Sequence, residues 1–223
     1  MIWVRQCAAI VHKEWRTELR TRHAVMAVLL FAVTTLVTIS LALGPAGVSS
    51  PERATVLPVL LWVLLLFAVA TGLPRTFGQE EETHTATALR LAVLPSALYA
   101  GKSLYSLSLV VVVEALVTPL FLALTSLTVP HPGRLVAALG LGAVGLAVVS
   151  TLIAAMVAQA PNRGALFPVL AFPVLLPLLL LAVELTRSAV TGEPAPMVAS
   201  QLLLYDGALA TAGLMLFPPV WNP

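Results

Sequence analysis

Three acidic side chains lie within or beside long apolar stretches of this 223-residue chain: Glu114, Glu184 and Asp206. A carboxylate inside a bilayer is costly, so each is a candidate for a transport pathway or a proton relay. Glu114 is the sharpest candidate because it falls in the middle of its stretch. Glu184 lies three residues before Arg187, a spacing that allows an ion pair on a helix. A hydrogen bond between packed helices is the alternative role for each acid.

Other catalytic or ligand-binding chemistry is missing from the sequence. The single cysteine, Cys7, cannot form an intrachain disulfide or a thiolate metal set. His131 stands in a Pro-rich turn, where a surface role is more usual than an axial bond to haem. The sequence has no phosphate-binding Gly-rich loop, no zinc-protease motif and no nucleophile elbow. We therefore expect no enzyme, no metal and no directly bound cofactor.

The composition places these residues in a membrane protein. Hydrophobic residues make up 59% of the chain and charged residues only 10%, whereas a soluble domain is roughly one quarter charged. A bilayer-crossing helix needs about 20 apolar residues. The unbroken apolar runs favour helices over a β-barrel, whose strands alternate. We expect an all-α integral membrane protein with six transmembrane helices, approximately over residues 24–43, 54–74, 103–129, 135–159, 165–187 and 198–219.

The positions of Lys and Arg indicate the orientation of these six helices. Cytoplasmic loops carry an excess of both residues. With the N-terminus in the cytoplasm, most of the twelve basic residues fall on the inner side, and only Arg53, Arg134 and Arg187 fall outside. We therefore expect both termini to be cytoplasmic. The loops between helices are short, which leaves no room for a soluble catalytic domain.

Residues 1–23 form one of two substantial cytoplasmic pieces. Apolar residues recur there at helical spacing, while Arg5, Lys13, Arg16 and Arg20 face elsewhere; the apolar positions are Val4, Ala8, Val11, Trp15 and Leu19. Basic residues attract anionic lipid headgroups. The pattern predicts an amphipathic helix lying on the inner leaflet. A plain topology anchor is the alternative.

Residues 75–102 form the other cytoplasmic piece. Glu80, Glu81 and Glu82 are three of the ten acids in the chain, and acids favour the positive end of a helix. The segment predicts a short helix exposed to the cytosol, followed by a turn at Pro95. On a membrane protein that has no catalytic domain, a short helix exposed to the cytosol indicates a docking surface. A solvated loop whose acids balance neighbouring arginines is the alternative.

Several stretches together resemble the haem exporter protein B family, the ABC transporter permease of cytochrome c maturation. The resemblance covers nearly the whole chain, and its most specific part is a Pro-rich run in the fifth apolar stretch. The similar stretches are KEWRTELRTR (13–22), GLPRTF (72–77), GK (101–102), LGAVGL (141–146), LFPVLAFPVLLP (166–177), YD (205–206) and LFP (216–218). One stretch departs from the family pattern: His84-Thr85-Ala86-Thr87 replaces a common Gly-Thr-Leu-Glu.

The resemblance implies an ABC-2-type architecture and a set of partners. Residues 1–23 would be an interfacial helix, and 24–219 a transmembrane domain that includes the coupling segment 75–102. The implied complex contains a second copy, an ATP-holding ATPase of the haem exporter protein A type, a membrane partner of the haem exporter protein C type and a haem chaperone. It would lie in the bacterial inner membrane, with haem as cargo and without nucleic acid.

The resemblance also assigns roles to individual residues. Prolines let a transmembrane helix bend where neighbouring groups satisfy the freed carbonyls, and the candidates for bending the fifth helix are Pro168, Pro173 and Pro177. The candidate contacts to the ATPase are Arg75, Gln79, Glu80, Glu81, Glu82, Thr85 and Arg90.

Two other transport functions stay open at this point. One is a permease of the same architecture for another cargo, such as a lipid or a drug. The other is a proton-coupled carrier that uses Glu114 and Asp206. Carriers of that kind are often built from internal repeats, and no convincing repeat is present in the sequence.

Overall fold

The computed structural model describes residues 2–21, 23–43, 50–72, 77, 86–158 and 163–221. In these ranges every regular element is a helix, which confirms the all-α prediction. The elements are α1 (Ile2–Thr21), α2 (His23–Leu43), α3 (Ser50–Gly72), α5 (Ala86–Ala92), α6 (Pro95–Thr125), α7 (Pro132–Ala158), α8 (Arg163–Thr191) and α9 (Val198–Trp221).

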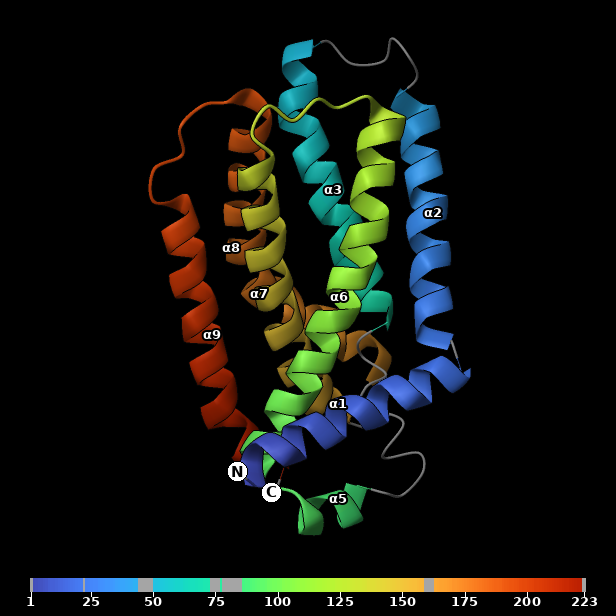
Figure 1. Cartoon of the computed structure of the whole chain (residues 1–223), viewed down its shortest axis with the longest axis vertical. Helices are drawn as coiled ribbons and strands as arrows, with labels where there is room; N and C mark the ends of the chain where they lie inside the picture. Colours follow the sequence, from blue (N-terminus) through green and yellow to red (C-terminus); the bar gives the residue numbers. More distant parts are fainter. Residues whose placement is uncertain are drawn as a thin grey trace.

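The long helices α2, α3, α6, α7, α8 and α9 form an elongated bundle (Figure 1). Five of them carry segments long and apolar enough to cross a membrane, and α2 carries a shorter apolar segment, Met26–Ala42. The chain is therefore an integral membrane protein of the expected architecture. The five long segments are Glu52–Thr71, Pro95–Thr125, Pro132–Ala158, Val169–Thr191 and Val198–Trp221.

The start of α6 differs from the sequence prediction. We expected a turn at Pro95 and a transmembrane helix from residue 103, whereas α6 begins at Pro95 and runs for 31 residues. Proline suits the first turn of a helix because its missing N–H has no partner to lose there. Lys102, which the hydropathy pattern leaves outside the apolar run, therefore lies on the helix itself.

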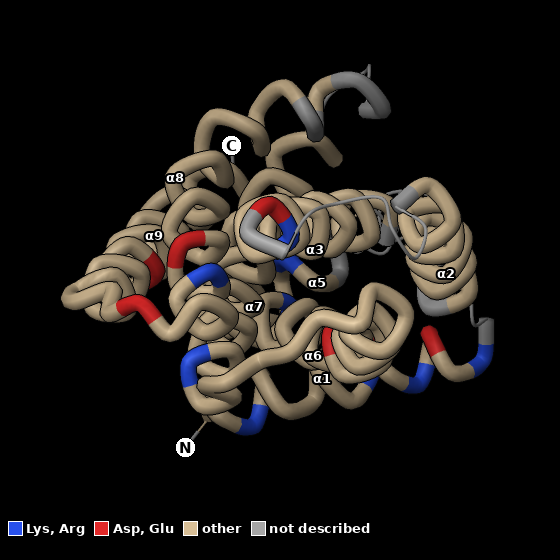
Figure 2. Tube along the Cα trace, turned by 90° about the horizontal axis from the view of Figure 1, so that it is seen from above, with Lys and Arg blue, Asp and Glu red and all other residues tan. Residues whose placement is uncertain are grey.

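The bundle has two unlike ends. At one end α1 lies across the long helices, α5 lies beyond them, and both termini are found (Figure 1). We call this the α1 end and the opposite one the far end. Viewed along the bundle, charged residues are sparse among the long helices, and basic positions follow α1 (Figure 2).

Glycines on α7 and α9 allow large side chains to lie directly against a helix backbone. A Cβ atom added to Gly142 would overlap the Trp62 ring, and one added to Gly213 would overlap the Tyr99 hydroxyl group. Small residues at such places let transmembrane helices approach closely. The indole Nε1 of Trp62 also donates to Thr186 Oγ1 at 2.9 Å. These contacts bind α3, α7 and α8 into one packed unit.

Candidate functional site

The helix α1 packs on α6 through a face that the sequence pattern did not identify. Its buried residues are Cys7, Ile10, Glu14 and Glu18, which recur at helical spacing. A Cβ atom on Gly101 would lie 2.9 Å from Ile10 Cβ, so α1 meets α6 at close range. The predicted helix is present, and this buried face is separate from the apolar stripe that the sequence pattern marks.

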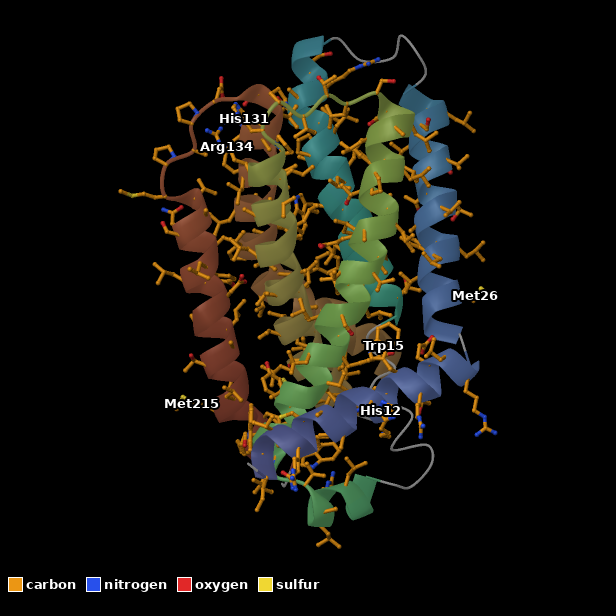
Figure 3. The ribbon with its side chains drawn as sticks, in the orientation of Figure 1. His12, Trp15, Met26, His131, Arg134 and Met215 are labelled. Carbon is orange, nitrogen blue, oxygen red and sulfur yellow. The ribbon has the colours of Figure 1, made fainter. Side chains whose placement is uncertain are left out.

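The predicted apolar stripe of α1 is partly exposed. Val4 and Leu19 are 64% and 63% exposed. Trp15 points toward α6 (Figure 3), donates from Nε1 to Ser108 Oγ at 2.9 Å and meets the Tyr105 ring edge-on. The helix therefore has three faces: a basic one, an apolar one and one fixed to α6.

A fully buried lysine lies where α1 meets α6. Lys102 has no exposed surface, and its Nζ lies 3.2 Å from Glu14 Oε1. The exposed Lys13 Nζ lies 3.1 Å from the same oxygen. Lys102 Nζ also lies 4.3 Å from the centroid of the Phe77 ring. A buried ammonium needs such partners, because an isolated charge in an apolar environment is strongly unfavourable.

Aromatic rings continue this contact into α9. The Phe77 ring lies 5.8 Å from that of Phe217 and 5.6 Å from that of Trp221. Tyr99 packs on Phe217 at 5.2 Å between centroids, and its hydroxyl donates to the Val148 carbonyl of α7 at 3.1 Å. We call the following set the α1-end cluster: Glu14, Phe77, Arg90, Tyr99, Lys102, Phe217 and Trp221.

Arg90 attaches the short helix α5 to this cluster, and Leu89 of the same helix packs against the hydrophobic core. The guanidinium carbon of Arg90 lies 5.1 Å from the Trp221 ring centroid, which is a cation–π distance. Its neighbour Leu91 is 86% exposed, and Leu94 is 51% exposed. Helix α5 is therefore attached to α9 through Arg90, while Leu91 on the helix and Leu94 just after it are exposed.

Most predicted contacts to an ATPase lie outside the residues that the structure describes. This holds for Arg75, Gln79, Glu80, Glu81, Glu82 and Thr85. Arg90 is described and is half-buried. The role of all seven residues stays a prediction.

The three acids of the apolar stretches have different surroundings. Glu184 accepts hydrogen bonds from Arg187 at 2.8 and 3.0 Å, as the spacing predicts. Glu114 and Asp206 are 5% and 3% exposed. Within the described part of the chain, Glu114 Oε1 and both Asp206 carboxylate oxygens have no hydrogen-bond partner. Asp206 lies against Gly145, because a Cβ atom there would be 2.5 Å from its Oδ1.

The three prolines of the fifth apolar stretch all lie inside α8, which continues through them from Arg163 to Thr191. Bending at Pro168, Pro173 and Pro177 stays a prediction. An apolar cavity of about 90 Å³ lies between α3, α7 and α8, where Ser150 is a polar lining residue. Among the described residues, no three His, Cys, Asp or Glu side chains come together as a metal site.

Comparison with known proteins identifies the family. The family model described as CcmB protein matches residues 5–219, which extend from α1 into the last turns of α9. The chain belongs to the CcmB protein family. It is accordingly a multi-pass membrane protein and a permease component of an ABC transporter in cytochrome c maturation. A search of curated proteins found no match.

The structure brings together four stretches that carried the family resemblance. Glu14 comes from residues 13–22, Phe77 from 72–77, Lys102 from 101–102 and Phe217 from 216–218. Sequence reasoning did not pair these residues, and it missed Trp221 altogether. The only feature that these residues share in the sequence analysis is that they lie in stretches similar to one family. Such similarity does not show which of them are in contact.

Proposed function

We propose that this permease component couples ATP hydrolysis on a separate ATPase subunit to haem handling. The ATPase, of the haem exporter protein A type, docks at the α1 end on α5 and the residues before it. The α1 end and both termini face the cytoplasm of a bacterial inner membrane. Family membership supports the ABC transporter role, and the position of α5 supports the docking surface.

The observation that carries this proposal is the two-sided environment of α5. The helix lies beyond the bundle (Figure 1), outside the segments apolar enough to span a membrane. On this helix, the side chain of Leu91 is 86% exposed, while Arg90 contacts the ring of Trp221. Leu94, three residues after Leu91, is 51% exposed, and exposed apolar side chains close together outside lipid favour an interaction surface. A partner that covers Leu91 would push on a helix already attached to the bundle.

The exposed apolar stripe of α1 supports the orientation. A helix with one basic and one apolar face lies in the membrane surface, with its apolar face toward the acyl chains. Because α1 crosses the bundle end beside α5, the docking surface lies at the level of the headgroups on that side. Basic residues near this surface favour the cytoplasmic leaflet.

The wider complex follows from the family resemblance. Two copies of the chain pair, and a membrane partner of the haem exporter protein C type and a haem chaperone act beside them. ATP hydrolysis then drives either export of haem or release of the haem-loaded chaperone. The permease itself holds no cofactor, and haem is cargo.

A charge placed on the exposed side of α5 tests the docking surface. Leu91→Asp should lower ATPase co-purification roughly tenfold or more, the range for a buried interface residue. The matched control is Met197→Asp, because Met197 is 75% exposed and lies at the far end. Both variants and the wild type are purified in mild detergent with the ATPase, and the subunit ratio is measured. Equal ratios for all three chains would contradict the proposal.

A further inference from the structure

We propose that Lys102 is a positioning residue at a joint that transmits movement of the coupling segment to α1 and α9. The joint consists of Glu14, Phe77 and Lys102, with Phe217 and Trp221 behind Phe77. This inference deepens the proposed function and rests on it for the source of the movement. The contacts that form the joint are properties of the chain alone.

Lys102 connects two elements that are distant in sequence. Its Nζ lies 3.2 Å from Glu14 Oε1 on α1 and 4.3 Å from the ring centroid of Phe77, which precedes α5. Lys102 itself is completely buried on α6. An ammonium without bulk water depends on both a carboxylate and an aromatic face. Displacing the ring therefore disturbs the ammonium, and the disturbance reaches α1 through the ion pair.

Phe77 also connects the joint to α9. Its ring is 1% exposed and contacts Phe217 and Trp221 at 5.8 and 5.6 Å. Phe217 and Trp221 stack on each other with an interplanar angle of 13°. Arg90 of α5 lies over the same Trp221 ring. Phe77 and Arg90 thus both contact aromatic rings at the end of α9. Displacement of α5 therefore moves the end of α9.

The close contact between α1 and α6 makes the joint stiff. Gly101, the residue before Lys102, packs directly on Ile10, and Cys7 Sγ donates to the Ala97 carbonyl at 3.3 Å. Packed interfaces of this kind move as units rather than deform gradually. A shift of Lys102 is therefore passed to the whole of α1 rather than absorbed by one side chain.

Hydrogen exchange in the purified chain tests whether Lys102 carries the link. Phe77→Leu should raise amide exchange in α1 around Glu14 roughly tenfold, the size expected for losing a desolvated cation–π contact. In a Lys102→Met background, the same Phe77→Leu change should alter α1 exchange less than about twofold. Lys102→Met leaves Glu14 next to Lys13. Lys102→Arg keeps the cation and should keep the response to Phe77→Leu.

Two matched variants control this measurement. Phe172→Leu removes a ring from the aromatic pair Phe67–Phe172 and should leave α1 exchange unchanged. Lys13→Met removes an exposed cation from the same Glu14 oxygen and should preserve the response to Phe77→Leu. An equal effect of Phe77→Leu with and without Lys102 would overturn the joint, as would no effect in the wild-type background. The absence of any effect of Phe77→Leu in the wild-type background would overturn the joint even when Lys102→Met does not fold.

A second measurement includes the ATPase subunit. Trapping its nucleotide-bound state with vanadate should change exchange in both α1 and the end of α9 in the wild type. Lys102→Met should keep the ATPase bound yet lose the α1 change, whereas Lys102→Arg should keep it. An unaltered α1 change in Lys102→Met would overturn the joint. Failure of the wild type to bind the ATPase would overturn the docking proposal instead, and the chain-alone exchange would still decide the joint.

Discussion

The two ends of the bundle hold their charged side chains in different environments. At the α1 end, Lys102 is buried between a carboxylate and an aromatic ring. At the far end, Arg187 is 36% exposed beside Glu184. Arg134, labelled there in Figure 3, donates from Nη1 to the carbonyls of Ser188 and Glu193, both at 3.1 Å.

This difference indicates that the charged side chains have unlike roles at the two ends. Arg134 satisfies backbone carbonyls where α8 stops, a common need of helix C-termini. Exposed ion pairs such as Glu184–Arg187 contribute little to stability. The α1-end charges instead connect α1 with α6 and α5 with α9, and their loss should reach further. The contrast fits the proposed docking of the ATPase at the α1 end.

The largest expected contrast is between two glutamates. Glu14→Gln removes the carboxylate from the buried Lys102 and should lower the free energy of unfolding by about 3 kcal/mol. Glu184→Gln weakens an exposed pair and should cost below about 1 kcal/mol. Denaturant titration in mild detergent, followed by circular dichroism, measures both. Similar losses for the two variants would remove the distinction between the ends.

A smaller contrast concerns two glycines. Gly213→Ala places a methyl group against the ring of Tyr99 and should cost about 2 kcal/mol through overpacking. Gly133, near the start of α7, has nothing within 4 Å of an added Cβ. Gly133→Ala should therefore be neutral or stabilise the chain by below about 1 kcal/mol. The same titration measures both variants, and a destabilised Gly133→Ala chain would contradict this packing difference.

The smallest contrast concerns thiol reactivity. Cys7 is 4% exposed, and burial raises the pKa of its thiol. Its contribution to stability is complete below about pH 8.5, the ordinary thiol pKa, and is lost as pH rises through the higher folded pKa. Maleimide should therefore label Cys7 at least roughly tenfold more slowly than a cysteine introduced at the far end by Met197→Cys in a Cys7→Ser chain. Equal rates would show that α1 does not stay packed on α6.

Hydropathy and spacing were sufficient to predict the helices of the bundle and of α1. Predicted and observed segments agree closely, for example 198–219 against Val198–Trp221. Such predictions succeed because a bilayer imposes one length and one polarity on every spanning helix. The start of α6 was missed because its first turns, through Lys102, extend beyond the apolar run.

The contacts within the α1-end cluster could not be predicted in the same way. The burial of Glu14 depends on Lys102, and the burial of Phe77 depends on Phe217 and Trp221. These partners are far apart in sequence, and no helical periodicity links them. A glutamate on a basic amphipathic helix is normally solvated. The pattern of α1 alone therefore predicts that the carboxylate of Glu14 faces water.

The attachment of α1 to α6 constrains how the protein is made. Glu14 and Lys102 are 88 positions apart, and two long helices, α2 and α3, come between them. Translation across that distance takes on the order of ten seconds. During this interval the ribosome has not yet supplied the surface on which α1 rests. Helix α1 therefore cannot reach its final place before α6 has been synthesised.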